Sequence, residues 1–245
     1  MKLSVSHNFA FLCNPKCGST SIEKAINKYC RVSFGGHPTL KHINAKTYHR
    51  HVVPMLQKAG VNERIETFCI MREPVERIFS WYRYQMRPLL ANPEHHAHAK
   101  YTGNMTFEEF VLGYISPDQP IHSSRIGRQA DFITLKDGTV GVDRVFPLED
   151  MSAVEEFLSS KIGKKISIPH RNISPVKKTG ANHKAPSGIF SIFGSRAKSA
   201  APAARAAPAS EAPKKLEMNI SAELLGRLKE YLEDDYRIYR NIARS

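Results

Sequence analysis

The sequence lacks any apolar stretch long enough to span a lipid bilayer, and its first residues lack the basic and then apolar pattern of a signal peptide. It also has only four cysteines, all in the first third of the chain: Cys13, Cys17, Cys30 and Cys69. Their number and placement predict free thiols in a reducing compartment and not a disulfide framework. No internal repeat is visible, which argues against a solenoid. We therefore expect a soluble cytoplasmic protein.

Acidic residues are scarce, since 23 Asp and Glu stand against 36 Lys and Arg, for a formal net charge of +13. Over half of this excess falls between Lys177 and Lys215, where Glu211 is the only acidic residue. The rest of the chain is moderately basic, which favours a pocket for a small, multiply charged ligand over a broad nucleic-acid surface. Simple solubility is the alternative explanation of the charge.

A chain of 245 residues with 41% hydrophobic residues can bury one core, so we expect a single domain over residues 1–245. From about Ala181 to Pro213 the composition changes to Ala, Pro, Ser and Lys. Such a segment cannot bury enough apolar surface to offset its ordering entropy, and we predict a disordered insertion there. Within it, Gly188–Gly194 is apolar and could dock on the body, on a partner or on a membrane surface.

Three short apolar segments are each followed by a helical pattern of apolar residues. The predicted strands are His7–Asn14, Glu66–Met71 and Val142–Pro147, and the helices after them are Ile22–Tyr29, Pro74–Tyr82 and Met151–Lys161. Further helices are predicted at Thr106–Tyr114 and Ser221–Ile242. Alternating strands and helices predict an α/β fold of three layers, with a central parallel sheet flanked by helices. Such sheets bind ligands at the carboxyl ends of their strands.

The segment Pro15–Ser21 joins the first predicted strand to its helix and has the features of an anion site. Gly18 lets the backbone approach a ligand, the backbone amides can point inward, and the helix N-terminus adds partial positive charge. A full charge and hydroxyl donors come from Lys16, Ser19, Thr20 and Ser21. The lysine precedes the glycine, unlike in an ATP-binding loop, which disfavours magnesium-dependent phosphoryl transfer. A turn that binds nothing is the alternative.

A second candidate site begins where the next predicted strand ends. Arg72 emerges from the strand tip, and Ser80 lies about two helical turns later, so a guanidinium and a hydroxyl could converge on one anion. Arg77 is expected to be a structural ion-pair partner. An ordinary helix start with an exposed arginine is the alternative.

Together these two segments resemble the sulfotransferases that use 3′-phosphoadenosine 5′-phosphosulfate (PAPS). That family has the form Pro-Lys-x-Gly-Ser/Thr-Thr-Ser in its first loop and Arg-x-Pro-x-x-Arg-x-x-Ser-x-Tyr after a later strand, and both are present here in order. The resemblance is closest to carbohydrate sulfotransferases and their compact bacterial relatives, and covers roughly Asn8 to Tyr239 apart from the insertion. It implies a P-loop-like sulfotransferase fold and PAPS as the donor.

The resemblance also implies roles for individual residues. Lys16 would steady the bridging oxygen as the sulfuryl group leaves, and Arg72 and Ser80 would hold the 3′-phosphate. The 5′-phosphosulfate would be held by the rest of the loop: Pro15, Cys17, Gly18, Ser19, Thr20 and Ser21. A later segment, Asn172–Gly180, is similar to the loop that closes over the nucleotide in relatives, which makes Lys177 and Lys178 candidate nucleotide contacts. The long insertion that follows is a departure from the family pattern.

Transfer to a hydroxyl needs a base for its proton, and histidine suits neutral pH. His37 is the favoured base, because relatives with this loop often carry a histidine segment shortly after the first helix. His42, His49 and His51 are the alternatives, and Glu66 is a weaker one. The histidine clusters lack the spacing of a zinc site, so no metal is expected. Lysine, arginines and fixed amides would stabilise the developing charge instead.

The segment between Tyr84 and Gln129 is expected to line the acceptor cleft. Its basic and aromatic residues suit a sugar, including an acidic one: Arg87, His98, Lys100, Tyr101, His122, Arg125, Arg128 and Gln129. We expect a hydroxyl of a carbohydrate or similar small molecule as acceptor, no specific nucleic-acid partner and no transmembrane segment. Peripheral membrane contact and the oligomeric state are open. The rival functions are a kinase-like nucleotide-binding enzyme and a non-enzymatic module that binds nucleotides or RNA through the insertion.

Overall fold

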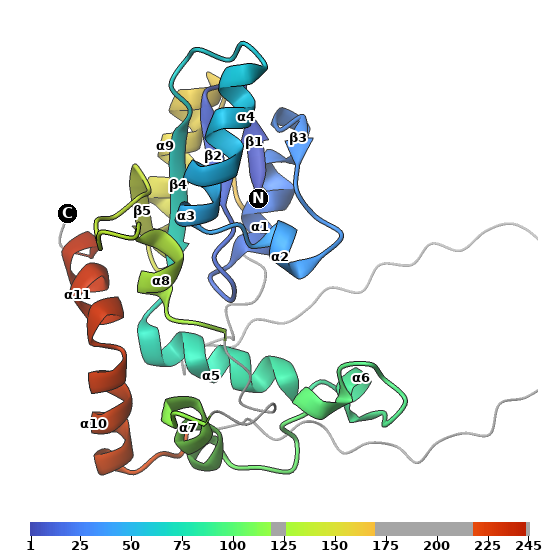
Figure 1. Cartoon of the computed structure of the whole chain (residues 1–245), viewed down its shortest axis with the longest axis vertical. Coiled ribbons are helices and arrows are strands. Elements are labelled where there is room, and N and C mark those ends of the chain that lie inside the picture. Colours follow the sequence, from blue (N-terminus) through green and yellow to red (C-terminus); the bar gives the residue numbers. More distant parts are fainter. Residues whose placement is uncertain (119–125, 170–217, 244–245) are drawn as a thin grey trace, which may run out of the picture. The chain divides into compact units, whose positions relative to one another are not determined.

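The computed structural model describes residues 1–118, 126–169 and 218–243, which belong to one compact unit. The three predicted strand and helix pairs are present, and Figure 1 shows their order along the chain. They are β2 (Phe9–Leu12) with α1 (Ser19–Ile26), β4 (Glu66–Met71) with α5 (Pro74–Gln85), and β5 (Arg144–Pro147) with α9 (Met151–Ile162). The α/β class is therefore confirmed.

The sheet is mixed, and not wholly parallel as predicted. The strand order is β3-β1-β2-β4-β5, with β2, β4 and β5 parallel to one another. The sequence pattern missed β1 (Lys2–Ser4) and β3 (Val32–Ser33), and β1 runs antiparallel to both of its neighbours. Strands of three and two residues are too short for an alternating pattern to identify.

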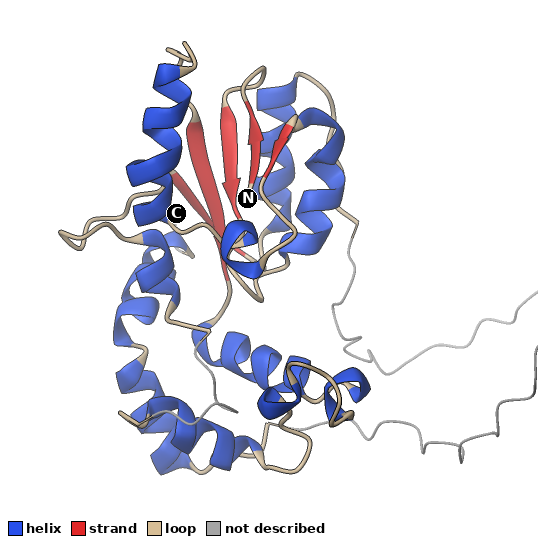
Figure 2. Ribbon diagram, turned by 45° about the vertical axis from the view of Figure 1, so that its right-hand side comes forward, coloured by secondary structure: helices blue, strands red, loops and turns tan. Residues whose placement is uncertain are grey.

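The sheet is buried on both faces, which makes the three layers (Figure 2). Alternate residues of β2 enter different cores: Ala10 and Leu12 join one cluster, and Phe9 and Phe11 join the other. This is the period of two expected of a strand. The first cluster includes Tyr48, and the second includes residues of α1 and α9.

Four short helical elements follow β3 where the sequence predicted none. They are α2 (Pro38–Lys41), α3 (Ala45–Thr47), the π-helical turn η2 (Tyr48–Val52) and α4 (Val53–Lys58). The side chains of His37 and Asn44 cap the first two, and Pro38 and Pro54 lie in first helical turns. Each is too short to show a clear helical period.

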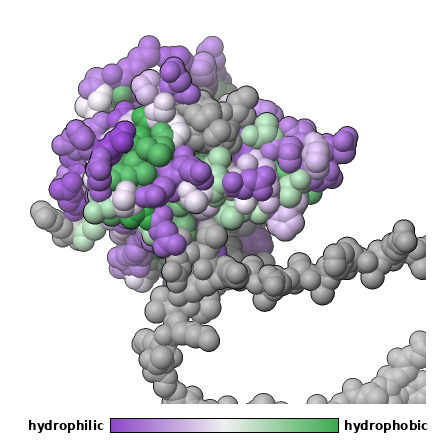
Figure 3. Space-filling view, turned by 90° about the horizontal axis from the view of Figure 1, so that it is seen from below, coloured by the Kyte–Doolittle hydropathy of each residue, from purple (hydrophilic) through white to green (hydrophobic). Residues whose placement is uncertain are grey.

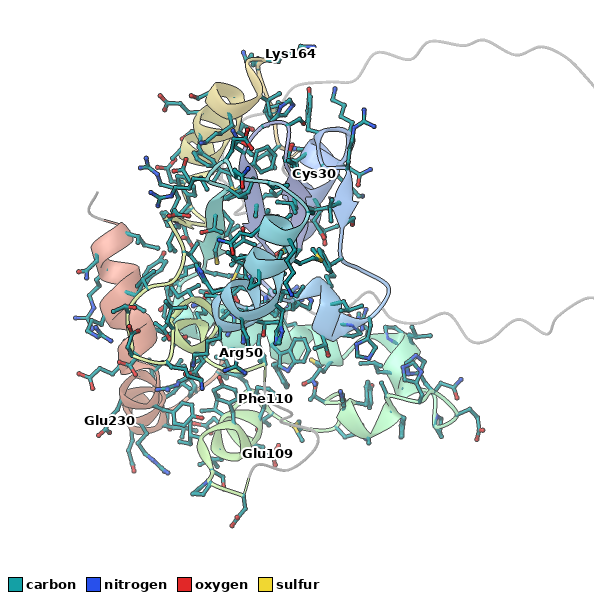
Figure 4. The ribbon with its side chains drawn as sticks, turned by 45° about the horizontal axis from the view of Figure 1, so that its top comes forward. Cys30, Arg50, Glu109, Phe110, Lys164 and Glu230 are labelled. Atoms are coloured by element: carbon teal, nitrogen blue, oxygen red, sulfur yellow. The ribbon has the colours of Figure 1, made fainter. Side chains whose placement is uncertain are left out.

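The helix predicted near residue 106 is α7 (Phe107–Ile115). It begins with a capping box, in which Thr106 and Glu109 each bond to the backbone of the other. Its two faces differ, as Figure 4 illustrates for Glu109 and Phe110, since Glu109 is exposed and Phe110 is fully buried.

The predicted C-terminal helix is two helices, α10 (Ala222–Tyr231) and α11 (Glu233–Ile242). They meet at Leu232, which is fully buried and has φ −98° and ψ 18°. The break lets α11 contact α8 (Gln129–Ile133) and β5. It therefore places Asp235, from the C-terminal part of the chain, against the first turn of α8.

The remaining short elements are η1 (Asn27–Tyr29), α6 (Pro88–Ala91) and η3 (His98–Lys100). Seen from below in Figure 3, the surface is mostly hydrophilic and includes an apolar area. None of the helices in the described ranges has the length and hydrophobicity of a membrane span. The predicted insertion at about 181–213 lies outside those ranges.

Candidate active site

The loop between β2 and α1 has an unusual backbone at two positions. Lys16 has φ 68° and Gly18 has φ 71°, both in the left-handed region. A β-carbon at Gly18 would also lie 2.6 Å from Cδ1 of Leu148. Left-handed residues within a turn direct neighbouring backbone N–H groups toward one concave surface, and no side chain caps the start of α1. The loop can therefore receive an anion.

The Ser19 side chain has a structural task. Its hydroxyl donates to the Asn14 carbonyl oxygen at 2.9 Å, and the residue is 8% exposed. Thr20 is exposed and Ser21 is half-buried, so their hydroxyls are better placed for a ligand. Of the predicted hydroxyl donors, Ser19 therefore stabilises the loop itself.

Arg77 stabilises this loop through buried hydrogen bonds. It is not the ion-pair partner that the sequence suggested. It is 1% exposed, and its guanidinium donates to the carbonyl oxygens of Pro15 at 3.0 Å and Gly127 at 2.9 Å. A third donor lies 3.4 Å from Oδ1 of Asn14. Hydrogen bonds from a charged donor are among the stronger ones in proteins, so we assign Arg77 to loop rigidity.

Lys16 lies among other cations. Its ammonium group is 4.1 Å from the centre of the Tyr84 ring. Burial, and then the positive charges of Arg87 and Arg72, lower the pKa of Lys16 to about 8, and Arg83 adds to the effect. A polyanion bound beside these cations would offset both the burial of Lys16 and the repulsion from its neighbours.

Arg72 directly follows the last residue of β4, at the same edge of the sheet as the loop Pro15–Ser21. In Figure 1, β4 runs down toward α5. The Arg72 guanidinium is 3.1 Å from the Glu76 carboxylate, with its side chain 26% exposed. Ser80 is half-buried on α5. Since Arg77 on α5 donates to the carbonyl oxygen of Pro15 in the loop, the structure brings the two sequence motifs together.

His37 and His42, the first two histidines after α1, have different surroundings. His37 is exposed, and its Nδ1 accepts from the Thr39 backbone N–H at 3.3 Å, so it caps α2. His42 is half-buried, and its Nδ1 is 2.6 Å from the carbonyl oxygen of Cys13 in the loop. A carbonyl oxygen can only accept, so Nδ1 carries the proton and Nε2 keeps its lone pair. Burial lowers the pKa of His42, which favours this neutral form.

The other candidate bases lie elsewhere. Glu66 begins β4, at the opposite end from Arg72, and pairs with Lys161 at 2.6 Å and with Arg144 at 2.9 Å. His49 Nε2 lies 2.9 Å from the Gly141 carbonyl oxygen. It borders a cavity of about 370 Å³ beside the start of β4, and none of the residues Pro15–Ser21 lines this cavity. His51 is exposed on η2.

The predicted acceptor residues do not share one environment. Arg87 stacks on Tyr84, with 3.5 Å between its guanidinium carbon and the ring centre, and Trp81 stacks on the same ring at 5.4 Å. His98 bonds to the Leu90 carbonyl oxygen at 2.8 Å. Tyr101 stacks on His98, and Lys100 is exposed. Arg87 therefore belongs to the Lys16 cluster.

Two further acceptor candidates have structural roles instead. Arg128 pairs with Asp131 at 3.1 Å and Asp234 at 3.2 Å. Gln129 is fully buried, so it cannot line a cleft, and it contacts both motifs of the site. No pattern in the sequence indicates this role. His122, Arg125, Lys177 and Lys178 lie outside the described residues.

The site's described part holds no group of three or more metal-ligating side chains. Its donors are lysine, arginine, hydroxyl and backbone N–H groups, which suit the oxygens of phosphate and sulfate. Fold and site thus define an α/β protein with a cluster of cationic side chains at the carboxyl ends of its parallel strands.

The comparison with known families identifies the chain further. The profile of the Sulfotransferase family matches residues 2–240. Because the match covers nearly the whole chain, the chain belongs to the sulfotransferase family and is an enzyme. Membership implies PAPS as the sulfuryl donor. No curated protein and no solved structure matches the chain.

Proposed function

We propose that this enzyme transfers the sulfuryl group of PAPS to a hydroxyl group of a carbohydrate acceptor. The observation that carries the proposal is the cation cluster beside the ends of β2 and β4. Lys16 and Arg87 lie 4.1 Å and 3.5 Å from the centre of the same Tyr84 ring, and the charge of Arg72 lowers the pKa of Lys16. The repulsion among these cations is relieved by a ligand with several negative charges. PAPS is such a ligand.

The donor roles follow from the elements that carry each residue. The backbone N–H groups of Gly18 and Ser19 and the hydroxyls of Thr20 and Ser21 hold the 5′-phosphate side of the donor. Pro15 and Cys17 complete the loop. Arg72 and Ser80 hold the 3′-phosphate, and the proposed contacts of Lys177 and Lys178 come from outside the described residues.

The transfer is an in-line displacement at sulfur. The acceptor oxygen forms a bond to sulfur on the side opposite the bridging oxygen, and the bond between sulfur and that oxygen breaks. The Lys16 ammonium group stabilises the negative charge that develops on the departing phosphate. The proton of the acceptor hydroxyl passes to a base, and 3′-phosphoadenosine 5′-phosphate (PAP) is left.

We propose that the base comes from the segment 37–42. His37 is the sequence candidate, while His42 is supported by its hydrogen bond to the loop and by the free lone pair on Nε2. Paired His37→Ala and His42→Ala variants separate them. The variant that removes the base lowers the transfer rate by about 100-fold or more while PAP affinity is preserved. If both variants keep the normal rate, the base is elsewhere and His51 is tested next.

A carbohydrate acceptor is supported by the aromatic pair Trp81 and Tyr84, whose rings are nearly parallel at 13°. Aromatic faces pack against the C–H face of a sugar ring, and the neighbouring arginines can bind its oxygens. Trp81→Ala should raise the acceptor KM in assays with carbohydrate acceptors and leave donor affinity unchanged. Leu112→Ala on α7 is the control, since Leu112 is a large apolar side chain that is 46% exposed. Equal effects of both substitutions would contradict the aromatic subsite.

The test of the function itself is transfer of labelled sulfate from PAPS to a panel of carbohydrate acceptors. Labelled product that disappears in Lys16→Ala, with that variant still folded, supports the proposal. Activity that persists in Lys16→Ala removes Lys16 from the mechanism.

A further inference from the structure

The side chain of Gln129 pairs with the backbone of Arg72 through two hydrogen bonds. Its Oε1 accepts from the Arg72 N–H at 3.0 Å, and its Nε2 donates to the Arg72 carbonyl oxygen at 2.8 Å. Only this orientation of the amide matches donors with acceptors at both atoms. The pairing resembles one more rung of a strand ladder, placed just after the last residue of β4, and it fixes the peptide groups from which the Arg72 side chain projects.

The side chain of Gln129 also contacts the loop between β2 and α1. Its Oε1 lies 3.2 Å from the Cys17 thiol and 3.4 Å from Nδ2 of Asn14. The Asn14 amide also donates to the Ile70 carbonyl oxygen at 3.1 Å. One buried amide oxygen therefore contacts the loop after β2 and the residue after β4, the two elements that would bind the two ends of the nucleotide.

Gln129 is itself held by the C-terminal helix. The Asp235 carboxylate accepts from the backbone N–H of Gln129 at 2.9 Å and from that of Ala130 at 2.7 Å. Asp235 is 1% exposed, and burial raises its pKa. Both oxygens of one carboxylate thus anchor the first turn of α8, so Gln129 cannot move without breaking these bonds.

We propose that Gln129 is a positioning residue for nucleotide binding, and that it acts by holding Arg72 in register with the loop Pro15–Ser21. The identity of the bound nucleotide in this inference rests on the proposed function. Gln129 has no exposed surface, so its effect on the nucleotide is transmitted through Arg72. A residue that only stabilised the fold would affect unfolding, and its effect on affinity would not depend on the Arg72 side chain.

The experiment is a double-mutant cycle on PAP affinity, measured by calorimetry, with Gln129→Met and Arg72→Ala. Methionine keeps a similar volume and removes both hydrogen bonds. We expect Gln129→Met to weaken PAP binding about ten-fold, which corresponds to about 1.4 kcal/mol. In the Arg72→Ala background the same substitution should change the affinity by less than about two-fold. Gln129→Glu, which keeps the oxygen and loses the donor, is the second variant if Gln129→Met does not fold.

Thr67→Val is the matched control, because it lies at the opposite end of the same strand. Thr67 is 2% exposed and also makes two side-chain hydrogen bonds, donating to Asp143 Oδ2 at 2.7 Å and accepting from the Asp143 N–H at 2.9 Å. It should lower thermal stability and leave PAP affinity within about two-fold of the wild type.

The outcomes are distinguishable. Wild-type protein that fails to bind PAP refutes the proposed function and this inference with it. Wild-type protein that binds PAP, together with Gln129 variants that bind it equally well, refutes only the positioning role. A full ten-fold loss that persists in the Arg72→Ala background, or that Thr67→Val reproduces, shows a general effect on the fold and also refutes it.

Discussion

The lowered pKa of Lys16 predicts that PAP affinity falls as pH rises above about 8. An ordinary lysine has a pKa near 10.5, and in the free protein burial and the neighbouring arginines lower it to about 8. Bound phosphate oxygens would raise it again, so binding takes up a proton wherever free Lys16 is neutral. If the pKa in the complex returns to its ordinary value, affinity falls about five-fold from pH 8 to pH 9 and about seven-fold again by pH 10.

Two measurements check this expectation. Calorimetry in buffers of different ionisation enthalpy should show uptake of about 0.8 proton at pH 8.5, the fraction of free Lys16 that is neutral there. Lys16→Arg should bind PAP with a much flatter pH profile, because a guanidinium does not titrate in this range. Lys28→Arg is the control and should keep the wild-type profile. A wild-type affinity that is constant from pH 7.5 to 9.5 would refute the account of the cationic cluster.

Other predictions concern stability and the division of roles. Lys16→Met should raise the free energy of unfolding at pH 7, by at most about 3 kcal/mol, because a shift of 2.5 pKa units disfavours the charged form by that amount. The gain should shrink as pH rises from 8 toward 10.5, where the native wild type binds fewer protons than the unfolded chain, and thermal melts at several pH values test this. Gly18→Ala should lower stability by about 1 to 2 kcal/mol in urea unfolding and weaken PAP binding, because of its left-handed φ; unchanged affinity would argue against the shape of the loop. Glu66→Gln should leave turnover unchanged and cost about 0.5 to 1 kcal/mol at pH 7. Hydrogen bonding from Lys161 lowers the pKa of Glu66, so this cost should be present above pH 4.5 and vanish as pH falls through the lowered pKa; a large loss of turnover would restore Glu66 as the base.

The sequence predicted the parts of the fold that depend on local patterns. Buried strands such as β4 are continuous apolar runs, and the helix after each begins with a recognisable turn, so their positions agree closely with the structure. Both candidate anion-binding motifs could be recognised because all of their residues are close together in the sequence. Their meeting at one edge follows from parallel pairing of β2 and β4.

What the sequence could not predict depends on contacts between distant residues. Gln129 is hydrogen-bonded to Arg72, which is 57 residues away in the sequence. Asp235 is hydrogen-bonded to Gln129 and is 106 residues away from it. A buried glutamine in a basic segment has the same appearance in sequence as an exposed one. The break at Leu232 was missed for a related reason: the apolar pattern continues through it, and the burial of Asp235 against α8 sets the direction of α11.

The central claim is that the cationic strand ends bind a nucleotide with a 3′-phosphate. The most direct test is calorimetric binding of PAP, compared with 5′-AMP and with magnesium-ATP under the same conditions. The account predicts tight binding of PAP that depends on its 3′-phosphate and needs no magnesium. Equal binding of PAP and 5′-AMP would contradict the role of Arg72 and Ser80, and preference for magnesium-ATP would contradict the assignment of the donor site.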